Sequence, residues 1–381
     1  MKWEKVRLED CCYSISDGDH QPPPKAQQGI PFVTISNINS MNQLDFSDTM
    51  FVPKEYYQSL DEKRKVRKGD VLYSVVGSFG IPVLIKEERP FVFQRHIAIL
   101  HPKEDIVDSG FLFYTMLNRD FYAKADAVAI GAAQRTVSLG SLRNIKIDVP
   151  SLESQKHIAD ILSAYDDLIE NNQKQIKLLE EAAQRLYKEW FVDLRFPGHE
   201  NTKIVDGVPE EWRKFPLEEI APVVTGKKDA NYGDKGGNYP FFTCSQETIT
   251  APGYSFDTSA VILAGNGDFN VKLYRGRFEA YQRTYVLAPF DHSNLFNLYF
   301  TVQDNMEALA KGASGSTIKF LTKGMLQKIL VLTADKKILD KFNDYEENIQ
   351  QKVEALKKQV EDLTEIRNRL LPKLMSGEVE V

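Results

Sequence analysis

The sequence lacks the patterns that carry most enzymatic chemistry. It contains no Gly-x4-Gly-Lys-Ser/Thr loop to hold nucleotide phosphates, no Gly-x-Ser-x-Gly elbow and no His-Glu-x-x-His pair. It also has no Asn/Asp-Pro-Pro-aromatic tetrad, with which an amino-methyltransferase holds a flipped base; the nearest string, at 21–24, has no aromatic residue. The three cysteines (Cys11, Cys12 and Cys244) and the six single histidines form no ligand cluster. We therefore expect a binding protein with no catalytic residue, no metal and no cofactor.

Long apolar stretches are missing as well. No run of eighteen apolar residues occurs, and residues 1–10 contain no apolar signal core, so we expect neither secretion nor a membrane span. Three cysteines without a disulfide pattern suit the reducing cytoplasm. With 381 residues, 42% of them hydrophobic and 27% charged, the chain is long enough for two or three ordinary globular domains.

A net positive charge is also absent, because 54 acidic residues outnumber 48 basic ones and the net charge is −6. Residues 1–150 nevertheless hold 19 basic and 19 acidic side chains, and residues 201–335 hold 14 and 15. Most of the negative excess lies in residues 151–200, with 6 basic side chains against 10 acidic ones. The two nearly neutral segments can therefore each present a basic face.

Two stretches of the chain repeat apolar residues with the spacing of a coiled-coil seam. In the first stretch, steps of four and three residues connect Ile158, Leu162, Tyr165, Ile169, Asn172, Ile176, Leu179, Ala183, Leu186 and Trp190. Adding 180 to each number gives Ile338, Phe342, Tyr345, Ile349, Lys352, Leu356, Gln359, Leu363, Ile366 and Leu370, of which eight are apolar. We expect two long helices that pack on each other as an antiparallel coiled coil.

Two polar residues lie near the middle of these seams. Antiparallel pairing would bring Asn172 and Lys352 close together, and buried polar seam residues commonly fix helix register at some cost in stability. In the alternative arrangement, Lys352 extends to water and Val353 occupies the seam. The sequence leaves both arrangements open.

The rest of the chain is duplicated too. Trp3 matches Trp212 at an offset of 209, and Phe93-Gln94-Arg95 matches Tyr281-Gln282-Arg283 at an offset of 188. A drifting offset is typical of a duplicated domain with loop insertions. We expect an α+β protein, a pseudo-two-fold tandem repeat of two small mixed α/β domains separated by the two helices. The expected parts are a first domain at 1–150, a helix at 151–196, a connector and second domain at 197–332, and a helix with its tail at 333–381.

Local patterns indicate what each domain contains. Segments rich in β-branched and aromatic residues, at 30–35, 71–76 and 91–93, predict short strands of a curved, mostly antiparallel sheet. Helical spacing predicts a helix at Phe111–Phe121 and another at Leu295–Leu309. Ser151 and Thr333 are expected to be the N-caps of the two long helices.

Several strings resemble a known family. The strings EWFVDLRFPGH at 189–199 and GVPEEW at 207–212 resemble the central junction of specificity (S) subunits of type I restriction–modification systems. Also similar to that family are GDVLYSVVGSFG at 69–80, VPSLESQKHIADIL at 149–162 and RNRLLPKLMSGEVEV at 367–381, so the resemblance covers essentially the whole chain. The second domain departs from the pattern at 260–263, which lack the Gly-Asp lead-in of residues 69–70.

The resemblance implies a DNA sequence-specificity subunit without catalytic residues of its own. Two target recognition domains would each read one half of a bipartite site in double-stranded DNA. The two helices would set the spacer length and dock two methyltransferase (M) subunits. Restriction (R) subunits would then complete an adenine-N6 DNA methyltransferase and restriction endonuclease complex.

Candidate DNA contacts follow from basic clusters and from the repeated Gln-Arg pair. In the first domain they are Lys63, Arg64, Lys65, Arg67 and Lys68, which suit phosphates, with Gln94 and Arg95. In the second domain they are, by composition, Lys227, Lys228, Lys272, Arg275 and Arg277, with Gln282 and Arg283. Arg suits guanine and Gln suits adenine, but domains that read different half-sites should differ at reading positions. The recurrence of the Gln-Arg pair therefore favours a structural or phosphate-contacting role.

Two other classes of function remain open at this point. One is a non-catalytic coiled-coil scaffold whose globular domains bind proteins, which salt-dependent DNA binding would distinguish from a DNA reader. The other is a self-contained restriction enzyme, which the missing motifs disfavour.

Overall fold

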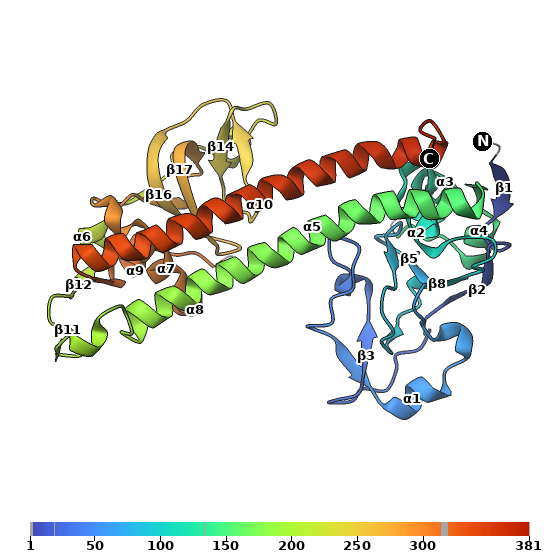
Figure 1. Cartoon of the computed structure of the whole chain (residues 1–381), viewed down its shortest axis with the longest axis horizontal. Coiled ribbons are helices and arrows are strands. Elements are labelled where there is room, and N and C mark those ends of the chain that lie inside the picture. The colour runs from blue at the N-terminus through green and yellow to red at the C-terminus, as the bar shows by residue number, and fades with distance from the viewer. Residues whose placement is uncertain (1–2, 19, 133, 314–318, 381) are drawn as a thin grey trace. The chain divides into compact units, whose positions relative to one another are not determined.

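The chain folds into two compact units, each of which uses part of both long helices (Figure 1). The computed structural model describes residues 3–18, 20–132, 134–313 and 319–380. Unit 1 comprises residues 1–173 with 358–381, and unit 2 comprises residues 174–357.

Unit 1 contains two small sheets and a two-stranded ribbon. The four-stranded sheet has the order β2 (Cys12–Asp17), β8 (Ile97–Pro102), β5 (Val71–Ser74), β6 (Pro82–Leu84), with antiparallel pairs throughout. The three-stranded sheet has the order β4 (Met50–Val52), β3 (Ile30–Val33), β7 (Val92–Phe93), and the β3–β7 pair is parallel. The ribbon pairs β1 (Glu4–Arg7) with β9 (Lys146–Val149). The expectation of a mostly antiparallel sheet is confirmed.

The central strand β5 is buried on both faces because successive side chains point to opposite sides of a sheet. Val71 and Tyr73 contribute to a core shared with the helices, whereas Leu72 contributes to a second core that contains Val33 and Phe91. The remaining helical segments of unit 1 are η1 (Ile35–Asn37), α1 (Lys54–Ser59), η2 (Glu62–Arg64), α2 (Ser109–Leu117), α3 (Arg119–Val128) and α4 (Leu139–Asn144).

Unit 2 repeats this topology in one continuous sheet. Its strand order is β13 (Val223–Thr225), β18 (Thr284–Leu287), β16 (Phe256–Ala264), β17 (Val271–Ala280), β14 (Tyr239–Phe242), β15 (Ile249–Ala251). A ribbon of β12 (Arg213–Pro216) and β19 (Leu330–Thr333) corresponds to the ribbon of unit 1. The ten-residue β17 pairs antiparallel with β16 and then, at its end, parallel with β14. In unit 1 the antiparallel pairing is made by β6 and the parallel pairing by β7. These are separate strands because residues 85–91 between them form a loop.

The smaller elements of unit 2 complete the repeat. They are η4 (His199–Asn201), β10 (Ile204–Val205), β11 (Val208–Pro209), α6 (Leu217–Ile220), η5 (Ala230–Tyr232), η6 (His292–Asn294), α7 (Leu295–Asp304), α8 (Met306–Gly312) and α9 (Lys323–Gln327). The helices predicted at Phe111–Phe121 and Leu295–Leu309 are each divided in two. Asn118 adopts an extended conformation between α2 and α3, and Asn305 separates α7 from α8.

The two long helices are α5 (Leu152–Tyr187), which continues into the π-helical turn η3 (Lys188–Val192), and α10 (Lys336–Ser376). Ser151 caps α5 as predicted, since its Oγ accepts a hydrogen bond from the Ser154 amide at 3.3 Å. The prediction for Thr333 is wrong, because this residue ends β19. Asp335 takes the cap position of α10, and its Oδ1 accepts from the Ile338 amide at 3.1 Å.

Within each unit, the segments of α5 and α10 run in opposite directions. In unit 1, Asp166 forms an ion pair with Arg367 at 3.1 Å, and further along α5 Asn172 bonds to Gln359 at 3.2 Å. In unit 2, Glu180 pairs with Lys357 at 3.1 Å, and the Trp190 and Phe342 rings lie 5.7 Å apart. In both units, rising residue numbers on α5 meet falling numbers on α10.

The predicted seam is right for α5 and partly wrong for α10. The ten α5 positions are all buried or half-buried. On α10, Glu346 is fully buried, whereas the predicted Tyr345 is 50% exposed. The cause is a second four-residue step after Phe342, which brings Glu346 and Val353 into the seam one residue after the predicted positions, whereas Leu356 is buried as predicted.

The same step corrects the predicted register pair. Lys352 is exposed and Val353 is 2% exposed, so the alternative arrangement is the one that occurs. Asn172 is buried as predicted, but its partner is Gln359. Lys352 is thus not a register residue.

The end of α10 belongs to the core of unit 1. Leu371, Leu374 and Met375 are buried in the cluster that contains Ile158 and Leu162 of α5. The 41-residue helix α10 therefore contributes apolar side chains to two cores, one in each unit.

Candidate nucleic-acid interface

The basic segment Lys63–Lys68 lies in an insertion that is specific to unit 1. It follows α1, includes part of η2, and leads into β5. Asp61 starts η2 by accepting a hydrogen bond from the Lys63 amide at 2.9 Å. In unit 2, β15 and β16 are joined directly by residues 252–255, all of which are described. The basic segment therefore has no equivalent at this point of unit 2.

One carboxylate neutralises part of this segment. Glu62 pairs with Lys65 at 2.6 Å and with Arg67 at 3.1 Å. The hydrogen bonds from Lys65 and Arg67 hold the pKa of Glu62 below its usual value. Lys63 and Lys68 are exposed, and Arg64 is half-buried. Lys63 and Lys68 can meet a phosphate without breaking these two pairs.

The repeated Gln-Arg pair lies in the same tight turn of both units, but at positions that differ by one residue. Gln94 and Arg95 connect β7 to β8, and Gln282 and Arg283 connect β17 to β18. The Ile97 amide donates to the Gln94 carbonyl in unit 1, and the Thr284 amide donates to the Tyr281 carbonyl in unit 2, so His96 occupies the position of Arg283. Both arginine side chains are exposed, and each turn projects one of them.

A glycine against each turn explains why the turn recurs. At the end of β2, a Cβ on Gly18 would lie 2.0 Å from the Phe93 carbonyl oxygen. Beyond β13, a Cβ on Gly226 would lie 1.9 Å from the Ala280 carbonyl oxygen. Only glycine allows this backbone approach. The turn itself thus has a structural basis, whereas the Gln-Arg pair occupies different positions within it, and a structural or phosphate-contacting role of the pair stays a prediction.

In unit 2 the structure brings four of the candidates together. The Gln282 amide nitrogen donates to the Lys228 carbonyl at 2.9 Å, and the Gln282 side chain donates to Asp229 at 2.7 Å. Lys228 lies over the Tyr232 ring at 4.3 Å. Exposed Lys227 and Arg283 are the chain neighbours of these residues, so the loop after Gly226 and the Gln-Arg turn form one basic surface.

The other three candidates of unit 2 do not join this surface; each makes contacts around β17. Lys272 donates to the Ser245 carbonyl at 2.7 Å, and burial lowers the pKa of Lys272. Arg275 pairs with Glu347 of α10 and lies over Phe296 at 5.1 Å. Arg277 pairs with Asp257 at 3.0 Å and lies over Tyr254 at 5.1 Å. These contacts stabilise the unit and reduce the freedom of the three cations to bind phosphate.

Sequence reasoning missed two basic residues that lie beside the glycine turns after β5 and β16. The Gly77 amide donates to the Arg135 carbonyl at 2.9 Å, and the Gly267 amide donates to the Lys319 carbonyl at 3.4 Å. Arg135 pairs with Asp126 at 2.8 Å, and Lys319 is exposed. Gly77 and Gly267 occupy matching positions in the two halves of the sequence, which indicates that the two turns correspond. This match does not show which distant loop each turn contacts.

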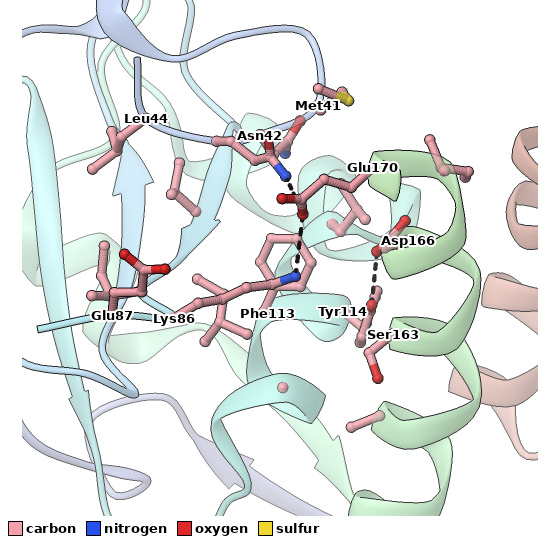
Figure 2. A pocket seen from close by; sticks show the side chains of 18 of the residues that line it. Met41, Asn42, Leu44, Lys86, Glu87, Phe113, Tyr114, Ser163, Asp166 and Glu170 are labelled. Carbon is pink, nitrogen blue, oxygen red and sulfur yellow. Dashed lines mark hydrogen bonds and ion pairs between the residues drawn. The ribbon is translucent and has the colours of Figure 1, made fainter. Parts of the chain in front are cut away.

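A cleft of about 770 Å³ in unit 1 lies between α5, α2 and the loops at 40–46 and 85–89 (Figure 2). Figure 2 shows Lys86 reaching towards Glu170 and Tyr114 towards Asp166. The distances are 3.7 Å for Lys86 to Glu170 and 2.7 Å for the Tyr114 hydroxyl to Asp166. Burial, with Asp166 beside it, raises the pKa of Tyr114. These polar contacts fasten α2 and the loop after β6 to α5.

Among residues 3–18, 20–132, 134–313 and 319–380, no group of three or more His, Cys, Asp and Glu side chains is placed to hold a metal ion. In the same part of the chain, no helix has both the length and the apolar character needed to cross a membrane.

Comparison with known proteins gives one family for both halves of the chain. The model of the type I restriction modification DNA specificity domain matches residues 1–181 and 209–362. The Escherichia coli type I restriction enzyme EcoDI specificity subunit is 36% identical over 176 residues, which are 45% of this chain and 39% of that subunit. The chain thus spans well under two thirds of that relative.

Two further comparisons extend over nearly the whole chain. The Haemophilus influenzae type I restriction enzyme HindI specificity subunit is 23% identical over 467 aligned positions, covering 99% of each chain. The crystal structure of a type I restriction–modification S subunit from M. genitalium has a TM-score of 0.65 at 17% identity, covering 98% of this chain and 96% of that one. At this identity the structural likeness shows a shared fold.

Proposed function

The chain belongs to the family of type I restriction modification DNA specificity domains, and from this premise we propose that it is the sequence-specificity subunit of a type I restriction–modification complex. In this role it recognises DNA and has no catalytic residues of its own. Its recognition domains are residues 1–150 and 197–332, and each reads one half of a bipartite site. The spacer helices are residues 151–196 and 333–381.

The observation that carries this proposal is the duplication of one recognition fold. The family model matches two separate stretches of the chain, and each stretch forms sheets with the same strand order. Unit 1 has a basic insertion that unit 2 replaces with a short connection. Two copies of a fold with different exposed loops suit the recognition of two different half-sites.

We further propose that α5 and α10 form one antiparallel coiled coil with pseudo-two-fold symmetry along their full length. The opposite direction of the segments within each unit supports this. At about 1.5 Å per residue, the 36 residues of α5 span about 54 Å and the 41 residues of α10 about 62 Å. Half-sites on one side of a duplex recur about every 34 Å, so helices of this length suffice to fix a spacer.

The recognition surfaces are proposed to include the Gln-Arg turn of each unit. In unit 1 the basic segment Lys63–Lys68 contributes phosphate contacts, and in unit 2 Lys227 and Lys228 do so. Arg95 and Arg283 extend from equivalent turns, so they are assigned to phosphates, which are common to all sequences. The base edges are contacted by loops that differ between the two units.

The partners in this proposal are double-stranded DNA, two M subunits that dock on the helices, and R subunits in the complete complex. The chemistry, transfer of a methyl group to adenine N6 or cleavage, belongs to those subunits. The chain itself determines which DNA sequence is recognised and how long the gap between the two half-sites is.

The direct test is to express the chain with the product of its neighbouring methyltransferase gene and to map methylated adenines across the host genome. A split motif with a gap of constant length is expected. Methylation at a continuous motif would overturn the bipartite reading. DNA binding that does not weaken with salt, or that is absent, would instead favour a scaffold that binds proteins.

A further inference from the structure

The basic segment of unit 1 is held at both ends by one buried pair. After β4 and α1, the segment returns to β5 through a turn at 67–70, in which the Asp70 amide donates to the Arg67 carbonyl at 3.1 Å. The Asp70 side chain is 6% exposed, and its Oδ2 accepts from the Arg67 amide at 2.6 Å. Asp70 therefore fixes the end of the segment that leads into the sheet.

His101 of β8 fixes the beginning of the basic segment, at Lys63. Its Nδ1 lies 2.7 Å from Asp70 Oδ1, and its Nε2 lies 3.2 Å from the Lys63 carbonyl oxygen. The Ser16 hydroxyl also donates to that carbonyl. The His101 side chain is 11% exposed, so water can replace these contacts only poorly. Val66, between the two ends, packs against the core cluster that contains Ile99 of β8.

Both partners of the His101 ring are hydrogen-bond acceptors. A carboxylate and a backbone carbonyl oxygen cannot donate, so each ring nitrogen must carry a proton to make both contacts. A neutral imidazole has one N–H and would satisfy only one of them. The ring thus lies between one acceptor at each end of the basic segment.

The pair occurs only where the basic insertion occurs. In unit 1, Val71 is paired with Leu100, and in unit 2 Val261 is paired with Leu287. These registers place Ala260 at the position of Asp70 and Ala288 at the position of His101. Unit 2, with its short connection at 252–255, has alanines in both places.

We propose that His101 and Asp70 are positioning residues that hold the basic segment of unit 1 in its DNA-binding conformation. This rests on the proposed DNA-binding function. Loss of either contact of the His101 ring releases Lys63 or the turn at 67–70. DNA contact by unit 1 then weakens, whereas contact by unit 2 does not.

The surroundings of the pair contain few other titratable groups. From β2, Cys12 lies near Asp70, and burial raises the pKa of Cys12 to about 12, so this thiol stays neutral. Lys103 follows β8 and donates to the Asp10 carbonyl at 3.1 Å. The insertion itself contributes the Lys63 carbonyl and the Arg67 amide. The aspartate is the negative charge in direct contact with the ring.

Two variants separate the clamp from general stability. His101→Phe keeps a ring but removes both contacts. Asp70→Asn keeps an acceptor for the Arg67 amide and offers an N–H to an unprotonated Nδ1, so a neutral ring can still donate to Lys63 through Nε2. His157→Phe, at an exposed position of α5, is the matched control.

One measurement on the full chain does not depend on DNA. Trypsin should cleave within residues 63–68 at least about threefold to tenfold faster in His101→Phe, the range expected for the loss of one hydrogen bond, and no faster in Asp70→Asn or His157→Phe. Unchanged cleavage in His101→Phe would overturn the clamp.

The second measurement is affinity for duplex DNA at fixed pH and salt. His101→Phe should bind about threefold to tenfold more weakly than the unaltered chain, whereas Asp70→Asn and His157→Phe should bind like the unaltered chain. Equal affinity in all four proteins would contradict the proposed role in binding. If none of them binds DNA at low salt, the proposed function itself fails, while the protease data still decide the clamp.

Discussion

Asn172 donates a hydrogen bond to Gln359 across the helix pair of unit 1, with 3.2 Å between Nδ2 and Oε1. Asn172 is 7% exposed, so a single polar side chain lies inside an otherwise apolar stretch of α5. A polar group that finds its partner in one alignment only selects that alignment over slipped ones.

We predict that Asn172→Leu raises stability and loosens the helix register. Burying a leucine contributes about 1.5–3 kcal/mol, whereas the lost hydrogen bond contributed about 1 kcal/mol, so the free energy of unfolding should rise by roughly 1 kcal/mol. The gap between methylated half-sites should become less uniform, as measured by genome-wide mapping. Lys352→Leu is the control, because Lys352 is exposed and should change neither quantity. An unaltered gap in Asn172→Leu would contradict the register role.

A second prediction concerns Glu346, which is fully buried in unit 2 with no hydrogen-bond partner found for either carboxylate oxygen among the described residues. Burial raises the pKa of Glu346 to about 8 from an ordinary value of 4.5. The folded state therefore binds a proton that the unfolded state has lost between these pH values. The stability that neutral Glu346 allows the folded state is fully present below about pH 4.5. It is lost as the pH rises through about 8, because the buried carboxyl group then becomes charged.

The measurement is the free energy of unfolding at several pH values for Glu346→Gln. This variant should lose the decline between pH 4.5 and 8 and should be more stable at the upper end, by a few kcal/mol in order of magnitude. Glu347→Gln is the control, since Glu347 is half exposed and pairs with Arg275. Parallel pH profiles for the unaltered chain and Glu346→Gln would show that this carboxyl is not what makes stability depend on pH.

A third prediction is that Glu62→Gln strengthens DNA binding. Removal of the carboxylate frees Lys65 and Arg67 for phosphates, so the slope of log affinity against log salt should steepen by about 1 to 2. Affinity at low salt should rise about threefold to tenfold. Glu55→Gln, an exposed position of α1, removes the same charge without freeing a partner. If both variants gain equally, net charge alone explains the effect.

A fourth prediction is that Arg95→Ala weakens binding to all DNA sequences alike. A lost phosphate contact should reduce the salt slope by about 1 and leave the preference for the cognate site unchanged. Arg283→Ala should behave in the same way, because it occupies the equivalent turn of unit 2. A loss confined to the cognate site would mean that these turns read bases.

The duplicated fold was predictable because it leaves a direct trace in the sequence. Trp3 and Trp212, and the two Gln-Arg turns, recur at offsets that drift only where loops differ in length. The helix pair was predictable for a similar reason, since α5 keeps its four-three spacing from Ile158 to Trp190. Backbone contacts such as Gly18 against Phe93 were not predictable, because they join residues far apart in the chain.

The one-residue shift on α10 shows where pattern reasoning failed. Apolar spacing selects Tyr345, and a glutamate is not expected in a seam, yet Glu346 is the buried residue. Tyr345 still contacts the Trp190 ring edge-on, 6.0 Å between centroids, from a half-exposed position. A large ring can reach its partner from beside the seam, so the helix tolerates a four-residue step that composition does not reveal.

The candidate site was predictable in part. The basic segment and the turns were found from composition and repetition. Arg275 and Arg277 form ion pairs with Glu347 of α10 and Asp257 of β16, so they are less available to phosphates. These pairs depend on where α10 and β16 lie, which a cluster of basic residues in the sequence does not indicate. The buried pair of Asp70 and His101 is formed by residues on two strands, neither of which stands out alone.

The place of Leu371, Leu374 and Met375 in the core of unit 1 affects the order in which the chain matures. A ribosome makes all of unit 2 before it reaches these residues. The half that is synthesised first must therefore wait, with part of its hydrophobic interior uncovered, until Leu371, Leu374 and Met375 of α10 have been translated. Unit 2 can close while unit 1 is still open, so the nascent protein is completed in the reverse of the order in which it is made.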